Sequence, residues 1–476
     1  MVINQINQIK ELEDSELNLK IEGQHNSLIL KDGKGKTVNI VNDHPDSQWF
    51  RNAGLGLFLH WGISAVDGTV DISWGMLDRG VHKRKELSRE EIEKLVVENN
   101  FSPTEKRLKP AHYFKLAEEF KAEKYDPDKW MRAAKKAGFR YAVLTTQHCD
   151  GFALWPTDFG EFSTKNYLGG RDLVREYVDA CRKYEIKVGF YYTPTNWYFN
   201  RKHMSFLHYL TKRKNPDLQE LDMNLEPVVL PDEEEMALQN KKVGVVARGQ
   251  LEELLTRYGK IDLLWTDGAF PTGETYPMRR IRELQPGIVV NGRMHGYGDF
   301  RNIEYKFIDQ KPEGWWEYCT IWSERPAWAY TRDSKYRPVS AIVTELVSTR
   351  RWGGNYLINI GPMADGEFPE DANQGLEDLA AWTTVNGESV FDTTVLLDGE
   401  KSNIPATAKE GIRYLFVLPG YFGVIELSGA GSPVSVKWLA DDSNVEYVYD
   451  DDEGTLRIVP QNIKTCDNVS VIKVIL

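Results

Sequence analysis

Apolar runs alternate with amphipathic stretches from His44 to about Thr394, and this alternation limits the possible folds more than any other feature of the chain. The amphipathic stretches carry the signals of helix ends. In DPDKWMRAAKKAG, Asp126 is a predicted N-cap, Pro127 takes the first helical position, and Gly138 ends the helix. Because each helix is followed at once by an apolar strand, the pattern favours right-handed βαβ units and a parallel sheet. The apolar runs are GLGLFLHW, YAVLTTQH, KVGFYYTP, IDLLWTDG, GIVVNGRM and NYLINIGP.

The number of these units indicates how the sheet is arranged. Six or more such units favour a closed (β/α) barrel of the TIM type over an open sheet. No GxGxxG motif follows any of the strands, which weakens the alternative of a dinucleotide-binding fold. We therefore predict an α/β protein whose catalytic domain is a (β/α) barrel.

The pattern changes at both ends of this region. From about residue 395 the chain consists of short alternating strands, such as RYLFVL and VSVKWL, separated by Gly, Pro and Asp clusters. This pattern predicts a small antiparallel β-sandwich. The first residues alternate weakly and predict a short β extension packed on the barrel. We expect three parts: the extension 1–43, the catalytic barrel 44–394 and the C-terminal sandwich 395–476.

Charge and composition exclude several classes of protein. The 476 residues carry 59 Lys and Arg against 71 Asp and Glu, a net charge of −12, which argues against nucleic acid or an anionic membrane as partner. No apolar run is long enough for a transmembrane helix. The N-terminus lacks the features of a secretory signal, so we expect a cytoplasmic protein, or a periplasmic or secreted one if the numbering follows signal removal. The oligomeric state is left open. Four cysteines without CxxC spacing are expected to be free thiols: Cys149, Cys181, Cys319 and Cys466.

Polar residues gather where the apolar strands end. An isolated pair such as Asp267-Gly268 is more often a turn than a site. In a (β/α) barrel, however, the active site lies at the carboxyl ends of the strands, and several strands here end in polar groups. Repeated polar strand ends therefore predict a site. These ends carry His60, Trp61, His148, Tyr191, Tyr192, Asp267, Arg293 and, just beyond, Glu304.

The residue types narrow the chemistry of this site. The nine histidines form neither an HxH nor an HExxH motif, and no GxSxG motif is present. We therefore expect no metal and no cofactor. Two carboxylates together with aromatic walls fit glycoside hydrolysis, in which one carboxylate attacks and a second carboxyl group donates a proton.

Several longer stretches carry a resemblance to a known family. The chain resembles the α-L-fucosidases of glycoside hydrolase family 29 over nearly its whole length. This resemblance implies a retaining exo-α-L-glycosidase with a fucosidase-type barrel, a C-terminal β-sandwich and a carbohydrate substrate. The matching stretches are WFRNAGLGLFLHWG (49–62), YDPDKWMRAAKKAGFRYAVLTTQHCDGFALW (125–155), GFYYT (189–193), LLWTDG (263–268), GDFRNIEY (298–305), WEYCT (316–320) and GGNYLINIGPMADG (353–366).

The resemblance also implies roles for individual residues. Asp267 matches the family's nucleophile, at the end of the W-x-D-G strand. GDFRNIEY is similar to the family's G-D-F-x-x-P-E segment and makes Glu304 the expected acid/base. Glu317, in the W-E-x-C segment, is the second candidate, with a buried structural glutamate as the alternative.

The remaining matches concern residues that bind the sugar. Tyr192 matches the pocket tyrosine, but Tyr191 stays open as the inward-facing one because neighbours on a strand face opposite ways. Arg293 is expected to orient the nucleophile, and Trp265 to line the wall near C6. His60, Trp61, Trp74 and His148 complete the expected set.

Two positions depart from the family pattern. Cys149 stands where the family usually has the second histidine of H-H-D-G-F, and Ser73 stands where a glutamate often precedes the tryptophan. In the family, the histidine and the glutamate usually found at these positions bind hydroxyl groups of the sugar ring. Their replacement makes an α-L-glucoside or an α-L-galactoside an alternative to an α-L-fucoside as the substrate. A non-catalytic sugar-binding relative is the alternative of another class.

Overall fold

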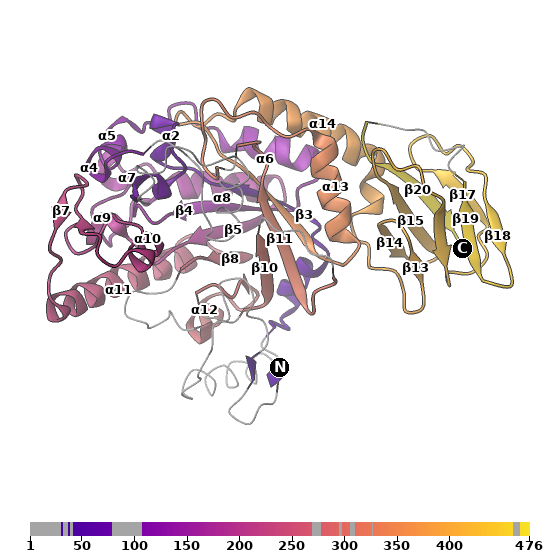
Figure 1. The fold of residues 1–476 in the computed structure, drawn as a ribbon, viewed down its shortest axis with the longest axis horizontal. Coiled ribbons are helices and arrows are strands. Elements are labelled where there is room, and N and C mark those ends of the chain that lie inside the picture. Colours follow the sequence, from indigo (N-terminus) through magenta and orange to yellow (C-terminus); the bar gives the residue numbers. More distant parts are fainter. Residues whose placement is uncertain are drawn as a thin grey trace.

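Eight parallel strands form the centre of the molecule. The computed structural model describes residues 41–78, 107–268, 278–294, 298–304, 310–325, 327–459 and 467–476, and the backbone of 30–31 and 37–38. The strands follow one another around the sheet in chain order (Figure 1). They are β3 (Leu55–Leu59), β4 (Tyr141–Gln147), β5 (Lys187–Tyr192), β8 (Leu263–Thr266), β9 (Val289–Val290), β10 (Phe300–Glu304), β11 (Trp315–Ile321) and β12 (Asn355–Ile360).

The sheet closes into a barrel. β12 pairs with β3 in parallel, so the last strand in the chain lies beside the first. A parallel bridge between Asn291 and Phe300 joins the two edge strands β9 and β10. The predicted (β/α) barrel is therefore confirmed.

Helices connect the strands as the capping signals predict. The Asp126 carboxylate accepts hydrogen bonds from the backbone N–H groups of Asp128 and Lys129, at 3.1 and 3.3 Å, and Pro127 begins α6. Gly138 has a φ of 90°, a left-handed conformation that stops the helix. The larger helices are α6 (Pro127–Lys136), α8 (Leu173–Lys183), α11 (Glu233–Thr256), α12 (Met278–Leu284), α13 (Val339–Arg350) and α14 (Glu370–Asn386).

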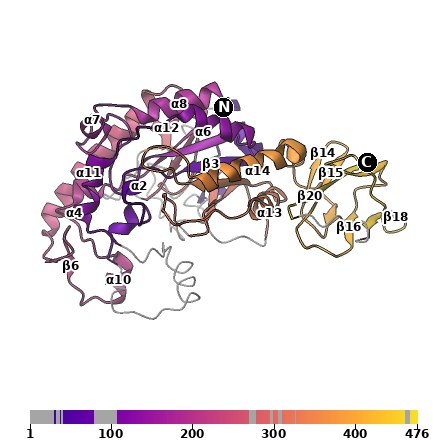
Figure 2. The same ribbon diagram turned by 90° about the horizontal axis from the view of Figure 1, so that it is seen from above.

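Shorter elements lie in the connections. Between β3 and β4 the structure has α2 (Ser64–Asp67), the 3₁₀ turn η2 (Ser73–Met76), α4 (Pro110–Tyr113) and α5 (Leu116–Glu119). The 3₁₀ turn η1 (Pro45–Asn52) precedes β3, and α7 (Thr164–Tyr167) precedes α8. Between β5 and α11 lie α9 (Trp197–Asn200), α10 (Tyr209–Lys214) and the hairpin β6 (Glu220–Leu221) with β7 (Pro227–Val228). This connection lies at the end of the molecule away from the sandwich (Figures 1 and 2).

Two antiparallel sheets form the C-terminal sandwich, with a core of their own. One sheet has the order β13 (Lys401–Ser402), β16 (Ile425–Ser428), β19 (Thr455–Ile458) and β18 (Val448–Asp450). The other has the order β14 (Ala406–Lys409), β15 (Ile412–Val417), β20 (Ser470–Ile475) and β17 (Ser435–Trp438). The predicted sandwich is confirmed.

The sandwich packs on α14, which lies between it and the barrel (Figure 2). The indole N–H of Trp382 in α14 donates to the backbone carbonyl of Val469, at 2.8 Å. Most of the expected N-terminal extension lies outside the described residues. The described part of it contains β1 (Leu30–Lys31), which pairs antiparallel with β2 (Thr37–Val38). The division at residues 43/44 and 394/395, and the packing of the extension on the barrel, stay predictions.

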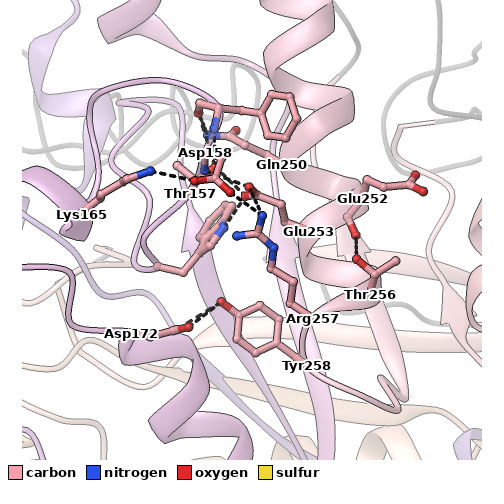
Figure 3. Close-up of polar contacts among 12 residues, drawn as sticks. Thr157, Asp158, Lys165, Asp172, Gln250, Glu252, Glu253, Thr256, Arg257 and Tyr258 are labelled. Atoms are coloured by element: carbon pink, nitrogen blue, oxygen red, sulfur yellow. Dashed lines mark hydrogen bonds and ion pairs between the residues drawn. The ribbon is translucent and has the colours of Figure 1, made fainter.

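Helix α11 holds the loop that follows β4. The buried carboxylate of Glu253 accepts hydrogen bonds from the indole of Trp155, the hydroxyl of Thr157 and the backbone N–H of Asp158, at 2.8, 2.6 and 2.9 Å (Figure 3). Arg257, one turn further along the helix, pairs with Asp158 at 2.7 Å. A buried carboxylate with several donors is well satisfied, so this contact anchors a loop that begins at the carboxyl end of β4.

Candidate active site

A pocket opens at the carboxyl ends of the barrel strands, where polar residues are expected. It encloses about 480 Å³, part of it open to solvent. Its walls combine aromatic rings with a few charged and imidazole groups. The lining residues are Phe58, His60, Asp71, Trp74, His148, Tyr191, Trp265, Asp267, Arg293, Glu304 and Trp328.

One guanidinium binds two carboxylates in this pocket. Asp267 directly follows β8, Arg293 follows β9 and Glu304 ends β10. Nη1 of Arg293 donates to Oδ1 of Asp267 at 3.1 Å, and Nη2 donates to Oε2 of Glu304. Burial by itself lowers the pKa of Arg293, but the two carboxylates outweigh it and raise that pKa, so the guanidinium stays charged. Asp267 is 23% exposed against 5% for Arg293, which leaves the Asp267 carboxylate open to a substrate.

The second oxygen of Asp267 is held by a tyrosine from the neighbouring strand. The hydroxyl of Tyr191 donates to Oδ2 of Asp267 at 2.9 Å. Tyr192 faces the other way, and its hydroxyl donates to the side-chain oxygen of Gln250 in α11 at 2.8 Å. The expectation that Tyr192 faces the sugar pocket is therefore corrected: side chains alternate along β5, and Tyr191 is the inward one.

Two histidines form a neutral part of the wall. Nδ1 of His60 is hydrogen-bonded to Oδ1 of Asn359 at 2.7 Å, and Nδ1 of His148 is hydrogen-bonded to the hydroxyl of Ser73. Burial lowers the pKa of His148 to about 4. Burial also lowers the pKa of His60, and the neighbouring His148 lowers it further. Both imidazoles are therefore neutral near pH 7, and each can exchange hydrogen bonds with a sugar hydroxyl.

Three expected sugar-binding residues do not line the pocket. The indole of Trp61 donates to the carbonyl of Met363 at 2.8 Å and packs in the barrel core. Ser73 is fully buried, with its hydroxyl on His148. Cys149 is buried as well, and burial raises the pKa of its thiol. None of these three residues is among those that line the pocket, so their expected contacts with the sugar stay predictions.

Glu317 is fully buried and is not among the residues that line the pocket. Its carboxylate accepts hydrogen bonds from the indole of Trp265, the hydroxyl of Tyr141 and the amide of Asn302, at 2.9, 2.7 and 3.0 Å. Burial raises the pKa of Glu317 to about 7. Since Glu304 lines the pocket and Glu317 does not, Glu304 has the better position for acid/base chemistry, and Glu317 holds the Trp265 wall.

Three of the residues that line the pocket were not identified from the sequence. Phe58 lies two residues before His60 on β3, so strand alternation could have found it. Asp71 and Trp328 come from loops and carried no pattern of their own. Oδ1 of Asp71 accepts from the backbone N–H of Trp328 at 2.7 Å, and the Trp328 ring lies 4.8 Å from that of His60.

Comparison with known proteins gives the family. A family model described as alpha-L-fucosidase matches residues 28–388. The chain belongs to the α-L-fucosidase family. Tissue α-L-fucosidase of Macaca fascicularis is 27% identical over 447 residues, which cover 88% of this chain and 86% of that protein. Its counterpart from Bos taurus is 28% identical over 411 residues, covering 81% and 78%. Among solved structures, α-L-fucosidase isoenzyme 1 from Paenibacillus thiaminolyticus has a TM-score of 0.69 and 28% identity, covering 91% of this chain and 99% of that one.

Membership of the α-L-fucosidase family confirms the resemblance found in the sequence and makes the protein a glycoside hydrolase acting on a carbohydrate. The non-catalytic alternative is not favoured. Within the described ranges, no group of three or more His, Cys, Asp or Glu residues is arranged to hold a metal ion. In the same part of the chain, no helix combines the length and apolarity needed to cross a membrane. The compartment and the absence of a nucleic-acid partner stay predictions.

Proposed function

We propose that this protein is a retaining exo-α-L-fucosidase, with Asp267 as the nucleophile and Glu304 as the acid/base. The observation that carries the proposal is the pair of carboxylates on one guanidinium: Arg293 binds both Asp267 and Glu304. Retaining glycosidases need two carboxyl groups about 5–5.5 Å apart, and sharing one guanidinium is compatible with that separation.

The reaction proceeds in two displacements. In the first, an oxygen of Asp267 bonds to C1 of the sugar while the glycosidic C1–O bond breaks and Glu304 gives its proton to the leaving oxygen. In the second, water attacks C1, releases the Asp267 carboxylate and gives a proton back to Glu304. Arg293 and Tyr191 hold the Asp267 oxygens throughout, so the nucleophile is oriented before the sugar arrives.

The pocket walls suit a 6-deoxy sugar. Phe58, Trp265 and Trp328 supply apolar surface for a methyl group and for the apolar face of the ring. His60 and His148 supply neutral partners for hydroxyl groups. Ser73 and Cys149 are not among the pocket-lining residues, and the family match is to α-L-fucosidases, so the alternative of an α-L-glucoside or an α-L-galactoside is not favoured.

The stereochemistry of the first product tests this function. Hydrolysis of an aryl α-L-fucoside, followed by proton NMR, should give α-L-fucose first, with the β anomer appearing later by mutarotation. Release of β-L-fucose first would contradict the retaining mechanism, and an α-L-galactoside that reacts faster than the fucoside would contradict the proposed sugar.

A further inference from the structure

A strained turn lies beside the sugar pocket. Ile72 is 2% exposed and has φ 35° and ψ −147°, a conformation that β-branched residues adopt only as outliers. Such conformations persist only where the surrounding structure holds them, and they gather at functional sites. The residues on either side, Asp71 and Ser73, are both fully buried and both make hydrogen bonds to pocket elements.

Asp71 holds one wall of the pocket. Its Oδ1 accepts hydrogen bonds from the backbone N–H groups of Trp328 and Ala329, at 2.7 and 3.1 Å. The side-chain amide of Asn359 donates to the carbonyl of Trp328 at 2.6 Å, and the same side chain holds His60. The backbone of Trp328 is therefore fixed on both sides, with its ring against His60. Asp71 acts on this wall through the Trp328 backbone.

Ser73 holds a second wall. Its hydroxyl is bonded to Nδ1 of His148, so this nitrogen is already occupied. The His148 ring is stacked on that of Tyr191, with centroids 5.5 Å apart and planes at 10°. Tyr191 in turn donates to Asp267. The hydroxyl either donates to Nδ1 or accepts from Nδ1–H, so the direction of this bond is coupled to the tautomer of the imidazole and to whether Nε2 donates to or accepts from a sugar hydroxyl.

We propose that the Asp71–Ile72–Ser73 turn is a positioning device for the sugar pocket: Asp71 sets the place of Trp328, and Ser73, through its bond to Nδ1, holds the orientation of the His148 ring and is coupled to its tautomer. This inference rests on the proposed function, because it assumes that a sugar binds between these walls. It also gives Ser73 a role that differs from the one expected from the family, since Ser73 acts through His148 and not on the substrate.

The test replaces Ser73 and follows three quantities. The variants are Ser73→Ala, Ser73→Thr as the rescue that keeps the hydroxyl, and Ser432→Ala in an exposed part of the sandwich as the matched control. Each is measured for kcat and KM on an aryl α-L-fucoside, for Tm, and for the ¹⁵N shifts of the His148 ring in protein labelled at histidine. A His148→Gln variant assigns the His148 signals.

Ser73→Ala should change His148 from a single tautomer to a mixture and raise KM about 10-fold, with a smaller change in kcat and little change in Tm. Ser73→Thr, which keeps the hydroxyl, should show the single tautomer and the KM of the unmodified protein. Ser432→Ala should leave KM, kcat, Tm and the His148 shifts unchanged. Asp71→Asn, which keeps an oxygen acceptor but loses the charge, should raise KM about threefold to 10-fold without moving the His148 shifts.

A Ser73→Ala protein whose His148 keeps a single tautomer, or whose activity falls only in step with Tm, would overturn the proposal. If the unmodified protein does not hydrolyse the fucoside, the proposed function fails. In that case the His148 shifts of Ser73→Ala still decide the positioning role, since they need no turnover.

Discussion

Tyr191 and Asp267 are joined by a hydrogen bond of 2.9 Å across two neighbouring barrel strands, while the next residue along the chain, Tyr192, turns away to α11. Two adjacent tyrosines of the same strand thus serve different parts of the molecule. One supports the nucleophile, and the other ties β5 to a helix outside the barrel.

This pair provides a matched comparison of two hydroxyl deletions. Tyr191→Phe should lower kcat about 10- to 100-fold, because Asp267 loses a donor that orients it and that stabilises the carboxylate released in the second displacement. Tyr192→Phe should leave kcat nearly unchanged and lower the free energy of unfolding by about 1 kcal/mol, because Gln250 loses its partner. Steady-state kinetics and urea unfolding of both variants check the prediction, and equal kinetic losses in the two would contradict it.

Glu304 and Glu317 differ in their expected response to the leaving group. Glu304→Ala should reduce activity far more on substrates with poor leaving groups than on activated aryl fucosides, and azide should restore the rate on the latter. Glu317→Gln keeps an oxygen that accepts from the indole of Trp265 and places its amide nitrogen against the hydroxyl of Tyr141, which can accept, so its activity should stay within about threefold of the original. If Glu317→Gln shows the leaving-group dependence and Glu304→Ala does not, the two roles are exchanged.

Arg293 should not be replaceable by lysine. An ammonium group is a point charge and does not bind two carboxylates in the fixed geometry of a guanidinium, so Arg293→Lys should lower kcat/KM about 100-fold. Arg293→Ala leaves two carboxylates without their shared partner and should also lower the free energy of unfolding by about 3–5 kcal/mol. Kinetics and thermal unfolding measure the two effects separately. A kcat/KM for Arg293→Lys within threefold of the original would contradict the assignment.

His148 should make stability depend on pH. Burial lowers its pKa from 6.5 to about 4, so between these values the unfolded chain binds a proton that the folded protein does not. The stability from the neutral imidazole is complete above pH 6.5 and is lost as the pH falls towards 4. Between pH 7 and pH 5 this amounts to about 2 kcal/mol.

Urea unfolding at the two pH values tests the effect by difference. His148→Gln cannot titrate, so its free energy of unfolding should fall by about 2 kcal/mol less than that of the unmodified protein between pH 7 and pH 5. The other titrating groups are common to both proteins and cancel in the comparison, apart from the part of the His60 shift that comes from His148. The same fall in both proteins would mean that His148 titrates normally in the folded state.

The sequence allowed prediction of the barrel and of the residues at the strand ends. Asp267, Arg293 and Glu304 end or follow parallel strands, and closure of the barrel brings such positions together whatever the loops do. The sequence did not decide which of Tyr191 and Tyr192 points into the pocket. This depends on strand register, because a shift of one residue exchanges the two faces of the strand.

Residues on loops were harder to place. Ser73 and Cys149 match positions that contact sugar in the family, but here neither is among the residues that line the pocket, and the Ser73 hydroxyl is bonded to His148. Trp328 and Asp71 reach the pocket through a contact between distant loops, and their separation along the chain leaves no periodic signal. The pattern and spacing of residues predict helices and strands, whereas these contacts depend on how the loops pack against one another.

Labelling of the nucleophile tests the central claim most directly. A 2-deoxy-2-fluoro-L-fucosyl fluoride should inactivate the protein by forming a glycosyl ester that hydrolyses slowly, because the fluorine destabilises the oxocarbenium-like transition state of the second step. Mass spectrometry of a peptic digest should find one fluorofucosyl group, on the peptide that contains Asp267. An adduct on any other carboxylate, or inactivation of the Asp267→Ala variant by the same label, would contradict the account.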